Sequence, residues 1–236
     1  MPELAKRTQP SELSATEIWL LVALPAALLI ATGFSYIAHA PGTSPLGIYE
    51  ALGFATGGAC VWLCVRQHLW NWPLGLANNV MFFALFLQSR LYGEMALQVV
   101  FFGFGVYGWW NWLYGGAQHN ALTVSRAHRY EWLALVLLIP STTWLLCEVL
   151  SAVKGAAPLW DALSTVISLA AQYLMSRKRV ENWLFWIVAD LILVPLYFSR
   201  GLYLTALLYA IFLTMCLIGG YAWWQSWRAA QRPAES

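Results

Sequence analysis

A carboxylate and several amide side chains lie in the middle of strongly apolar stretches of this sequence. Asp190 is at the centre of the run 182–199, and Asn79, next to Asn78, is at the centre of the run 70–88. A charged group at the bilayer centre costs roughly 2.5–3.5 kcal/mol on insertion scales, so it usually faces a cavity or a polar partner. These side chains are therefore candidates for a ligand site inside a membrane, with an interhelical hydrogen bond as the alternative.

Aromatic rings accompany these polar groups at helical spacing. Trp183, Trp186 and Asp190 stand at i, i+3 and i+7, which is one face of a helix. The same spacing recurs in Trp72, Gly75 and Asn79. Aromatic faces stack on flat rings and attract cations, so the pattern favours a flat, polar ligand that can carry positive charge.

Gln98 and Gln172 are further candidates for the same site, because each is an uncharged amide well inside an apolar run. Either could instead bond a neighbouring helix. The sequence contains no HExxH, GxGD or Ser-His arrangement, and its cysteines form no CxxC pair. We therefore predict no catalytic, metal or cofactor site. An intramembrane enzyme is the alternative from another class, and a structural membrane protein or receptor is a third.

The composition indicates that lipid covers much of the surface. Of 236 residues, 60% are hydrophobic and only 10% are charged, against roughly 25% charged in soluble domains. The net charge of +2 gives no support for nucleic-acid binding. About 20 apolar residues cross the hydrocarbon layer as a helix. Eight stretches meet this length, near 17–39, 45–65, 70–88, 94–114, 130–150, 159–176, 182–199 and 202–225.

The distribution of basic residues predicts the orientation of these spans. Eight crossings place ten of the 13 Lys and Arg residues on one side, including Lys6 and Arg7 near the N-terminus and the run Arg177-Lys178-Arg179. Short loops rich in Lys and Arg stay in the cytoplasm, so both termini are expected there. Ala38-His39-Ala40 resembles a signal-peptidase site, but the apolar run before it is longer than a signal peptide needs. We expect this first span to be retained.

The chain contains an internal repeat. A single constant offset aligns 49–112 with 160–223 without gaps and pairs polar residues as well as apolar ones, among them Glu50/Asp161, Arg66/Arg177, Asn71/Asn182, Trp72/Trp183 and Asn79/Asp190. Each repeat holds three spans, and an even number of crossings separates equivalent helices. The repeats are therefore predicted to be parallel, a duplication that favours transport by two bundles rocking about a shared site.

The predicted fold is thus all-α and integral to the membrane, with two parallel three-helix bundles joined by a linker helix (3+1+3) and one extra N-terminal transmembrane helix. The predicted divisions are a cytoplasmic tail 1–16, an accessory helix 17–40, a first repeat 41–114, a loop and linker helix 115–151, a second repeat 152–225 and a cytoplasmic tail 226–236.

Three segments of this sequence resemble the PnuC family of nicotinamide riboside transporters. They are Trp70-Asn71-Trp72-Pro73-Leu74-Gly75-Leu76-Ala77-Asn78-Asn79, Tyr107-Gly108-Trp109-Trp110-Asn111-Trp112 and Glu181-Asn182-Trp183-Leu184-Phe185-Trp186. The resemblance covers roughly residues 45–225. It implies a SWEET-like 3+1+3 fold, a homotrimer in the bacterial inner membrane, and uptake of nicotinamide riboside by facilitated diffusion with phosphorylation trapping the substrate for NAD biosynthesis.

The resemblance also gives the candidate residues a ligand, because nicotinamide riboside carries a pyridinium charge, an amide and a ribose. Trp183 is expected to stack on the ring and Asp190 to offset the charge. The amides expected to bond the carboxamide or ribose are Asn78, Asn79, Gln98 and Gln172. Related proteins take up thiamine or riboflavin, and thiamine is also a cationic heterocycle. These vitamins are the alternative substrates, and a competition assay would separate them.

Overall fold

The structure, a computed structural model, describes residues 48–88, 92–153, 157–199 and 203–231. Its helices are α3 (Ile48–Val65), α4 (Asn71–Gln88), α5 (Tyr92–Tyr114), the short η1 (Ala117–His119), α6 (Arg129–Ala152), α7 (Pro158–Ser176), α8 (Asn182–Ser199) and α9 (Tyr203–Gln231). The described residues form no strand beyond one isolated bridge between Ser125 and Arg179. The predicted all-helical class is confirmed.

The helix bounds follow the predicted spans closely. Each of the helices α3 to α9 lies on one predicted span. Both ends of each helix lie within a few residues of the predicted bounds, apart from α9, which continues to Gln231. The predicted first span, 17–39, lies outside the described residues. By length and hydropathy alone, three helices of the described chain qualify as spans, namely Arg129–Ala152, Asn182–Ser199 and Ala206–Gln231.

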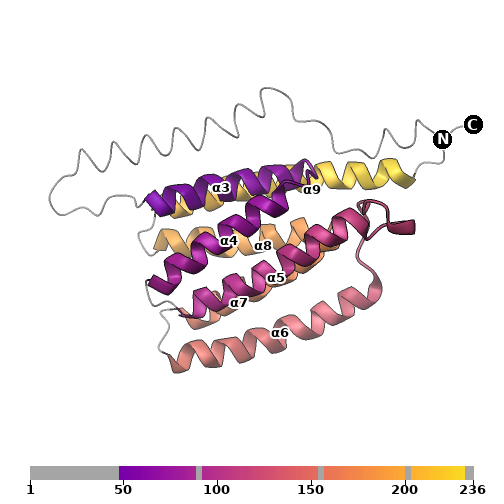
Figure 1. Cartoon of the computed structure of the whole chain (residues 1–236). Helices are drawn as coiled ribbons and strands as arrows, with labels where there is room; N and C mark the ends of the chain where they lie inside the picture. The colour runs from indigo at the N-terminus through magenta and orange to yellow at the C-terminus, as the bar shows by residue number, and fades with distance from the viewer. Residues whose placement is uncertain (1–47, 89–91, 154–156, 200–202, 232–236) are drawn as a thin grey trace, which may run out of the picture. The chain divides into compact units, whose positions relative to one another are not determined.

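The chain divides inside α5, between Val106 and Tyr107, into two compact units. In the first unit α3 packs on α4, and α5 approaches α4 so closely that a Cβ on Gly105 would lie 2.8 Å from a methyl carbon of Leu76. In the second unit α8 packs on both α7 and α9, and α7 also packs on α6 (Figure 1).

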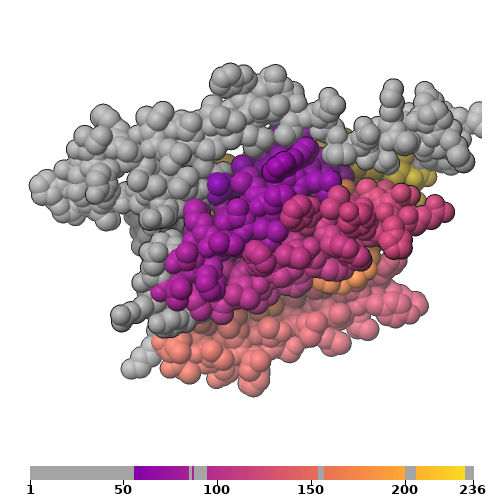
Figure 2. All heavy atoms as spheres, in the orientation of Figure 1, coloured from indigo at the N-terminus to yellow at the C-terminus, as the bar shows by residue number. Residues whose placement is uncertain are grey.

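Helix α6 lies at the edge of the second unit and exposes most of its apolar side chains. Figure 2 shows its side chains at the surface of the unit. Leu133, Val136, Leu137 and Trp144 are each more than half exposed. Because a helix with an apolar surface all round is stable only in an apolar environment, this surface matches contact with lipid.

The turns that join α3 to α4 and α7 to α8 have the same geometry. Gln67 and Lys178, which the offset of the internal repeat pairs, both have φ of 55° and both end their helix in the left-handed conformation. His68 N donates to Leu63 O at 2.8 Å, and Arg179 N donates to Leu174 O at 2.9 Å. These i to i−5 bonds belong to the Schellman type of helix C-cap, which satisfies carbonyls that the helix leaves free.

An asparagine closes each of these turns from the next helix. Asn71 Nδ2 donates to His68 O at 2.9 Å, and Asn182 Nδ2 donates to Arg179 O at 2.6 Å. Each amide thus ties the first residue of α4 or α8 to the preceding turn and sets the direction of the helix that carries the candidate site residues. The Asn-Trp motif therefore has a structural function in both units.

Candidate functional site

Trp183 begins the series of candidate residues on α8 and is almost fully buried, with 2% of its surface exposed. Its ring meets the Trp223 ring edge-on, with centroids 5.5 Å apart and planes at 87°. It also lies against Gly219 of α9, where a Cβ would come within 2.5 Å of the six-membered ring. Trp183 Nε1 has no hydrogen-bond acceptor among the described residues.

Asp190 lies two turns further along α8 and faces α9 as well. It is 4% exposed, and its Oδ2 accepts a hydrogen bond from Cys216 Sγ at 3.6 Å. Within the described part of the chain, no basic side chain lies at ion-pair distance from this carboxylate. Trp186, between them in sequence, is half-buried. The predicted common face of Trp183 and Asp190 is thus directed towards α9.

The first unit holds the remaining candidates on α4 and α5. Trp72 is 2% exposed. Asn78 Nδ2 donates to Thr56 Oγ1 of α3 at 2.6 Å, which is the interhelical hydrogen bond weighed as the alternative. Asn79 and Gln98 line one pocket of about 200 Å³ between α4 and α5. The other residues that line it are Val80, Phe83, Val99 and Phe102.

The structure therefore brings the candidates together as two groups, each within its own unit. Trp183 and Asp190 share the α8–α9 interface, and Asn79 shares a pocket with Gln98. Gln172, on α7, is half-buried and, within the described ranges, joins neither group. Four partners of these residues, Thr56, Cys216, Gly219 and Trp223, were not among the predicted site residues, because the sequence of one helix does not show what lies opposite it on another.

One end of the second unit carries a network of charged residues. The segment before α6 runs beside the α7–α8 turn, where Ser125 N donates to Lys178 O at 3.1 Å and Val180 N donates to Ser125 O at 2.9 Å. Glu131 pairs with Arg177 at 3.2 Å and with Arg179 at 3.1 Å. The two arginines and Lys178 belong to the group predicted to share one side of the membrane, and the structure places them at one end of this unit.

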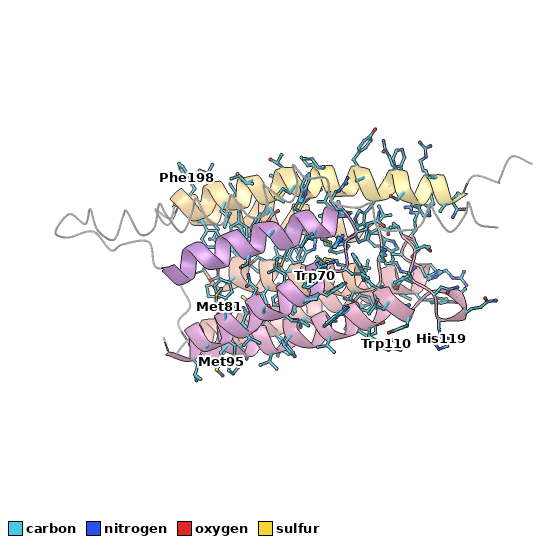
Figure 3. All side chains as sticks on the ribbon, turned by 45° about the horizontal axis from the view of Figure 1, so that its top comes forward. Trp70, Met81, Met95, Trp110, His119 and Phe198 are labelled. Atoms are coloured by element: carbon cyan, nitrogen blue, oxygen red, sulfur yellow. The ribbon has the colours of Figure 1, made fainter. Side chains whose placement is uncertain are left out.

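Aromatic side chains gather at the same end. Trp112 Nε1 donates to Met175 O at 3.0 Å, and the Lys178 ammonium lies 4.6 Å from the centre of the Trp112 ring. Trp110, labelled beside His119 in Figure 3, is 57% exposed. A mixture of basic and amphipathic aromatic side chains is typical of the headgroup level of a membrane protein.

Comparison with known proteins identifies the kind of protein. The family model described as "Nicotinamide mononucleotide transporter" matches residues 47–225, well over half of the chain. The chain belongs to this family. It is 30% identical over 223 residues to the nicotinamide riboside transporter PnuC of Escherichia coli, a match that covers 81% of this chain and 92% of that protein. It is therefore a membrane protein of a transporter family.

Two further matches extend the comparison. The riboflavin/roseoflavin transporter RibM of Streptomyces davaonensis is 28% identical over 188 residues, covering 78% of this chain and 88% of that protein. A crystal structure of the vitamin B3 transporter PnuC matches with a TM-score of 0.63 and 20% identity, covering 97% of this chain and 99% of that one. The chain thus shares the fold of that transporter, and the family suggested by its Asn-Trp motifs is confirmed.

Proposed function

We propose that this chain takes up nicotinamide riboside across the bacterial inner membrane by facilitated diffusion, with phosphorylation inside the cell retaining the product. Family membership and the 30% identity to the Escherichia coli nicotinamide riboside transporter support this substrate. The chain acts as a transporter and not as an enzyme. The RibM relative makes riboflavin the first alternative, and thiamine is the second because it is also a cationic heterocycle.

The observation that carries the proposal is the buried Asp190 carboxylate without a basic partner among the described residues. A buried charge needs a countercharge or strong hydrogen bonds. The Cys216 thiol is a weak donor, so it satisfies little of that need. The permanent positive charge of nicotinamide riboside would supply the rest. Riboflavin has no cationic ring, so this observation favours the pyridinium substrate.

The other candidate residues receive roles from the same ligand. Trp183 stacks on or bonds the ligand, and its free Nε1 donor supports a polar contact there. Asn79 and Gln98, which line one pocket, bond the carboxamide or ribose. Asn78 contributes through its carbonyl oxygen, since its Nδ2 is already bonded to Thr56. Gln172, Trp186 and Trp72 complete the proposed set.

The proposed architecture is a 3+1+3 arrangement. The bounds of α4 and α8 are related at both ends by the offset of the internal repeat, and so are the two Schellman turns, which supports a duplicated unit. In this arrangement 41–114 and 152–225 form the two bundles. The loop and linker helix 115–151, which contains α6 except for its last residue, joins them. The accessory helix 17–40 precedes them, both tails (1–16 and 226–236) are cytoplasmic, and three copies assemble as a homotrimer in the lipid bilayer.

Uptake by the purified full-length protein in liposomes tests the proposal. Unlabelled nicotinamide riboside should compete with labelled nicotinamide riboside far better than riboflavin or thiamine does. Asp190→Asn should weaken apparent affinity by about 10- to 100-fold, because a hydrogen-bonded charge contact is worth about 1.5–3 kcal/mol. Asp161→Asn, at the start of α7, is the matched control and should leave uptake unchanged. Unchanged affinity and rate for Asp190→Asn would remove this carboxylate from the site.

A further inference from the structure

The second unit has an open pocket that contains one proposed transport residue, Trp183, and several residues to which the transport site gives no role. It has a volume of about 460 Å³ and is formed by α8, α9 and the segment before α6. The residues that give it its chemistry are Arg126, Glu181, Leu184, Ile187, Tyr221 and Trp224. One side of the pocket is therefore charged, and the other is apolar and aromatic.

Arg126 provides an anion-binding group at the charged side. Its side chain is 62% exposed, and its Nε donates to Glu181 Oε1 at 3.0 Å. The other oxygen of Glu181 accepts from Ala127 N at 2.9 Å, which fixes the carboxylate in place. Across the described ranges, the two terminal nitrogens of Arg126 have no acceptor. A guanidinium that is held through Nε, with both terminal nitrogens available, can bind a phosphate through those two nitrogens.

The apolar side continues away from the charged end as a strip of exposed side chains. Leu184 is 52% exposed and Tyr221 is 63% exposed. Leu191, two helical turns after Leu184, and Leu217, one turn before Tyr221, are each 57% exposed and extend the strip along α8 and α9. A strip of this length along two packed helices offers a surface for an extended hydrocarbon chain.

The pocket also lies near basic and aromatic side chains of the second unit. The basic residues of the α7–α8 turn are at this end of the unit, and Arg228 lies over the Trp224 ring at 4.2 Å. Arg126 itself lies 5.5 Å from the centre of the Trp227 ring. Basic pockets beside aromatic residues at helix ends are a recognised setting for phospholipid headgroups.

We propose that this pocket binds a membrane glycerophospholipid, with the phosphate on Arg126 and one acyl chain over Leu184 and Leu191. The Arg126–Glu181 pair is electrically neutral as a whole, so a headgroup with extra negative charge gains little here. The Glu181 side chain is 9% exposed, so the headgroup meets mainly Arg126, and a zwitterionic headgroup adds no net charge to the neutral pair. The preferred ligand is therefore phosphatidylethanolamine over phosphatidylglycerol.

Native mass spectrometry of the full-length protein in detergent, with added phosphatidylethanolamine, tests the proposal. Arg126→Gln should reduce the bound lipid about tenfold, whereas Arg129→Gln should leave it unchanged. Arg129 is the matched control because it is exposed at the same end, bonds Tyr130 and does not line the pocket. Equal losses in the two variants would indicate general charge attraction and overturn the proposal. Displacement by inorganic phosphate at millimolar concentration would also overturn it.

A second measurement uses the wild-type chain and does not depend on the stability of any variant. A phosphatidylethanolamine with a photoreactive group near the start of one acyl chain should label Leu184, Ile187 or Tyr221. Labelling confined to other segments would refute the site. Cross-links between these residues and a second copy of the chain would show that a protein subunit covers the pocket instead. Stronger binding of phosphatidylglycerol than of phosphatidylethanolamine would overturn the headgroup assignment.

Discussion

Replacing Gly219 with alanine should force the Trp183 ring out of its place between α8 and α9. An added Cβ would lie 2.5 Å from two ring carbons and 2.7 Å from a third, so the rigid indole has to move by roughly 1 Å to reach ordinary contact. Such overpacking costs about 1–3 kcal/mol. Alanine regains about 0.5–1 kcal/mol through its higher helix propensity. The net loss in unfolding free energy should be about 1–2 kcal/mol.

Thermal unfolding of the purified protein in detergent measures this loss. For a chain of this size a loss of about 1–2 kcal/mol lowers Tm by about 2–8 °C. Gly103→Ala is the matched control, because nothing lies within 4 Å of its added Cβ, and it should keep or raise Tm. Uptake should fall in Gly219→Ala, since Trp183 belongs to the proposed site.

A double variant decides whether the Trp183 ring is the cause. Phenylalanine lacks the outer carbons of the indole, so Trp183→Phe should remove the clash. Gly219→Ala should then destabilise the Trp183→Phe background by much less than it destabilises the wild type. Additive effects of the two substitutions, or a Gly219→Ala protein as stable as the wild type, would refute the packing described for this interface.

Two further predictions concern contacts that hold the helices in place. Thr56→Ala and Asn78→Ala should each lower the unfolding free energy by about 0.6–1.7 kcal/mol and should couple in a double-mutant cycle of thermal unfolding, because the two residues share one hydrogen bond. Only Asn78→Ala should also weaken uptake. Equal uptake by the two variants would remove Asn78 from the site. Glu131→Gln should lower the unfolding free energy by about 1–2 kcal/mol, because it weakens two ion pairs with the α7–α8 turn as well as the cap of α6. Glu148→Gln is an exposed control on the same helix and should leave Tm unchanged. Equal shifts of Tm in the two variants would contradict the charged network around Glu131.

Helix positions could be predicted from the sequence because apolar runs and loop residues mark them directly. The predicted span 182–199 coincides with α8, and the predicted span 159–176 differs from α7 only at its first residue. The constant offset between the repeats relates the turns as well as the helices. It predicts equivalent turns, and the structure gives Gln67 and Lys178 the same left-handed conformation although neither is glycine.

The partners of the site residues could not be predicted in the same way. Asp190 was identified because a carboxylate in an apolar run is conspicuous, whereas the Cys216 thiol that donates to it looks like any small buried residue. Thr56 and Gly219 were missed for the same reason, since their importance comes from what lies opposite them on another helix. Such pairings depend on helix rotation and depth, which the spacing along one helix does not determine.

The two units differ at two positions that the repeat offset makes equivalent. The offset that aligns the repeats pairs Asn79 with Asp190 and Gly105 with Cys216. In the first unit, the glycine leaves room for Leu76, and Asn79 lies in an otherwise largely apolar pocket. In the second unit, the carboxylate and a thiol donor stand together at the α8–α9 contact. At these equivalent positions the second unit thus has a hydrogen-bonded carboxylate, Asp190, and the first unit has an amide, Asn79, next to apolar side chains. For the proposed cationic ligand, the second unit would supply the charge and the first unit a neutral amide.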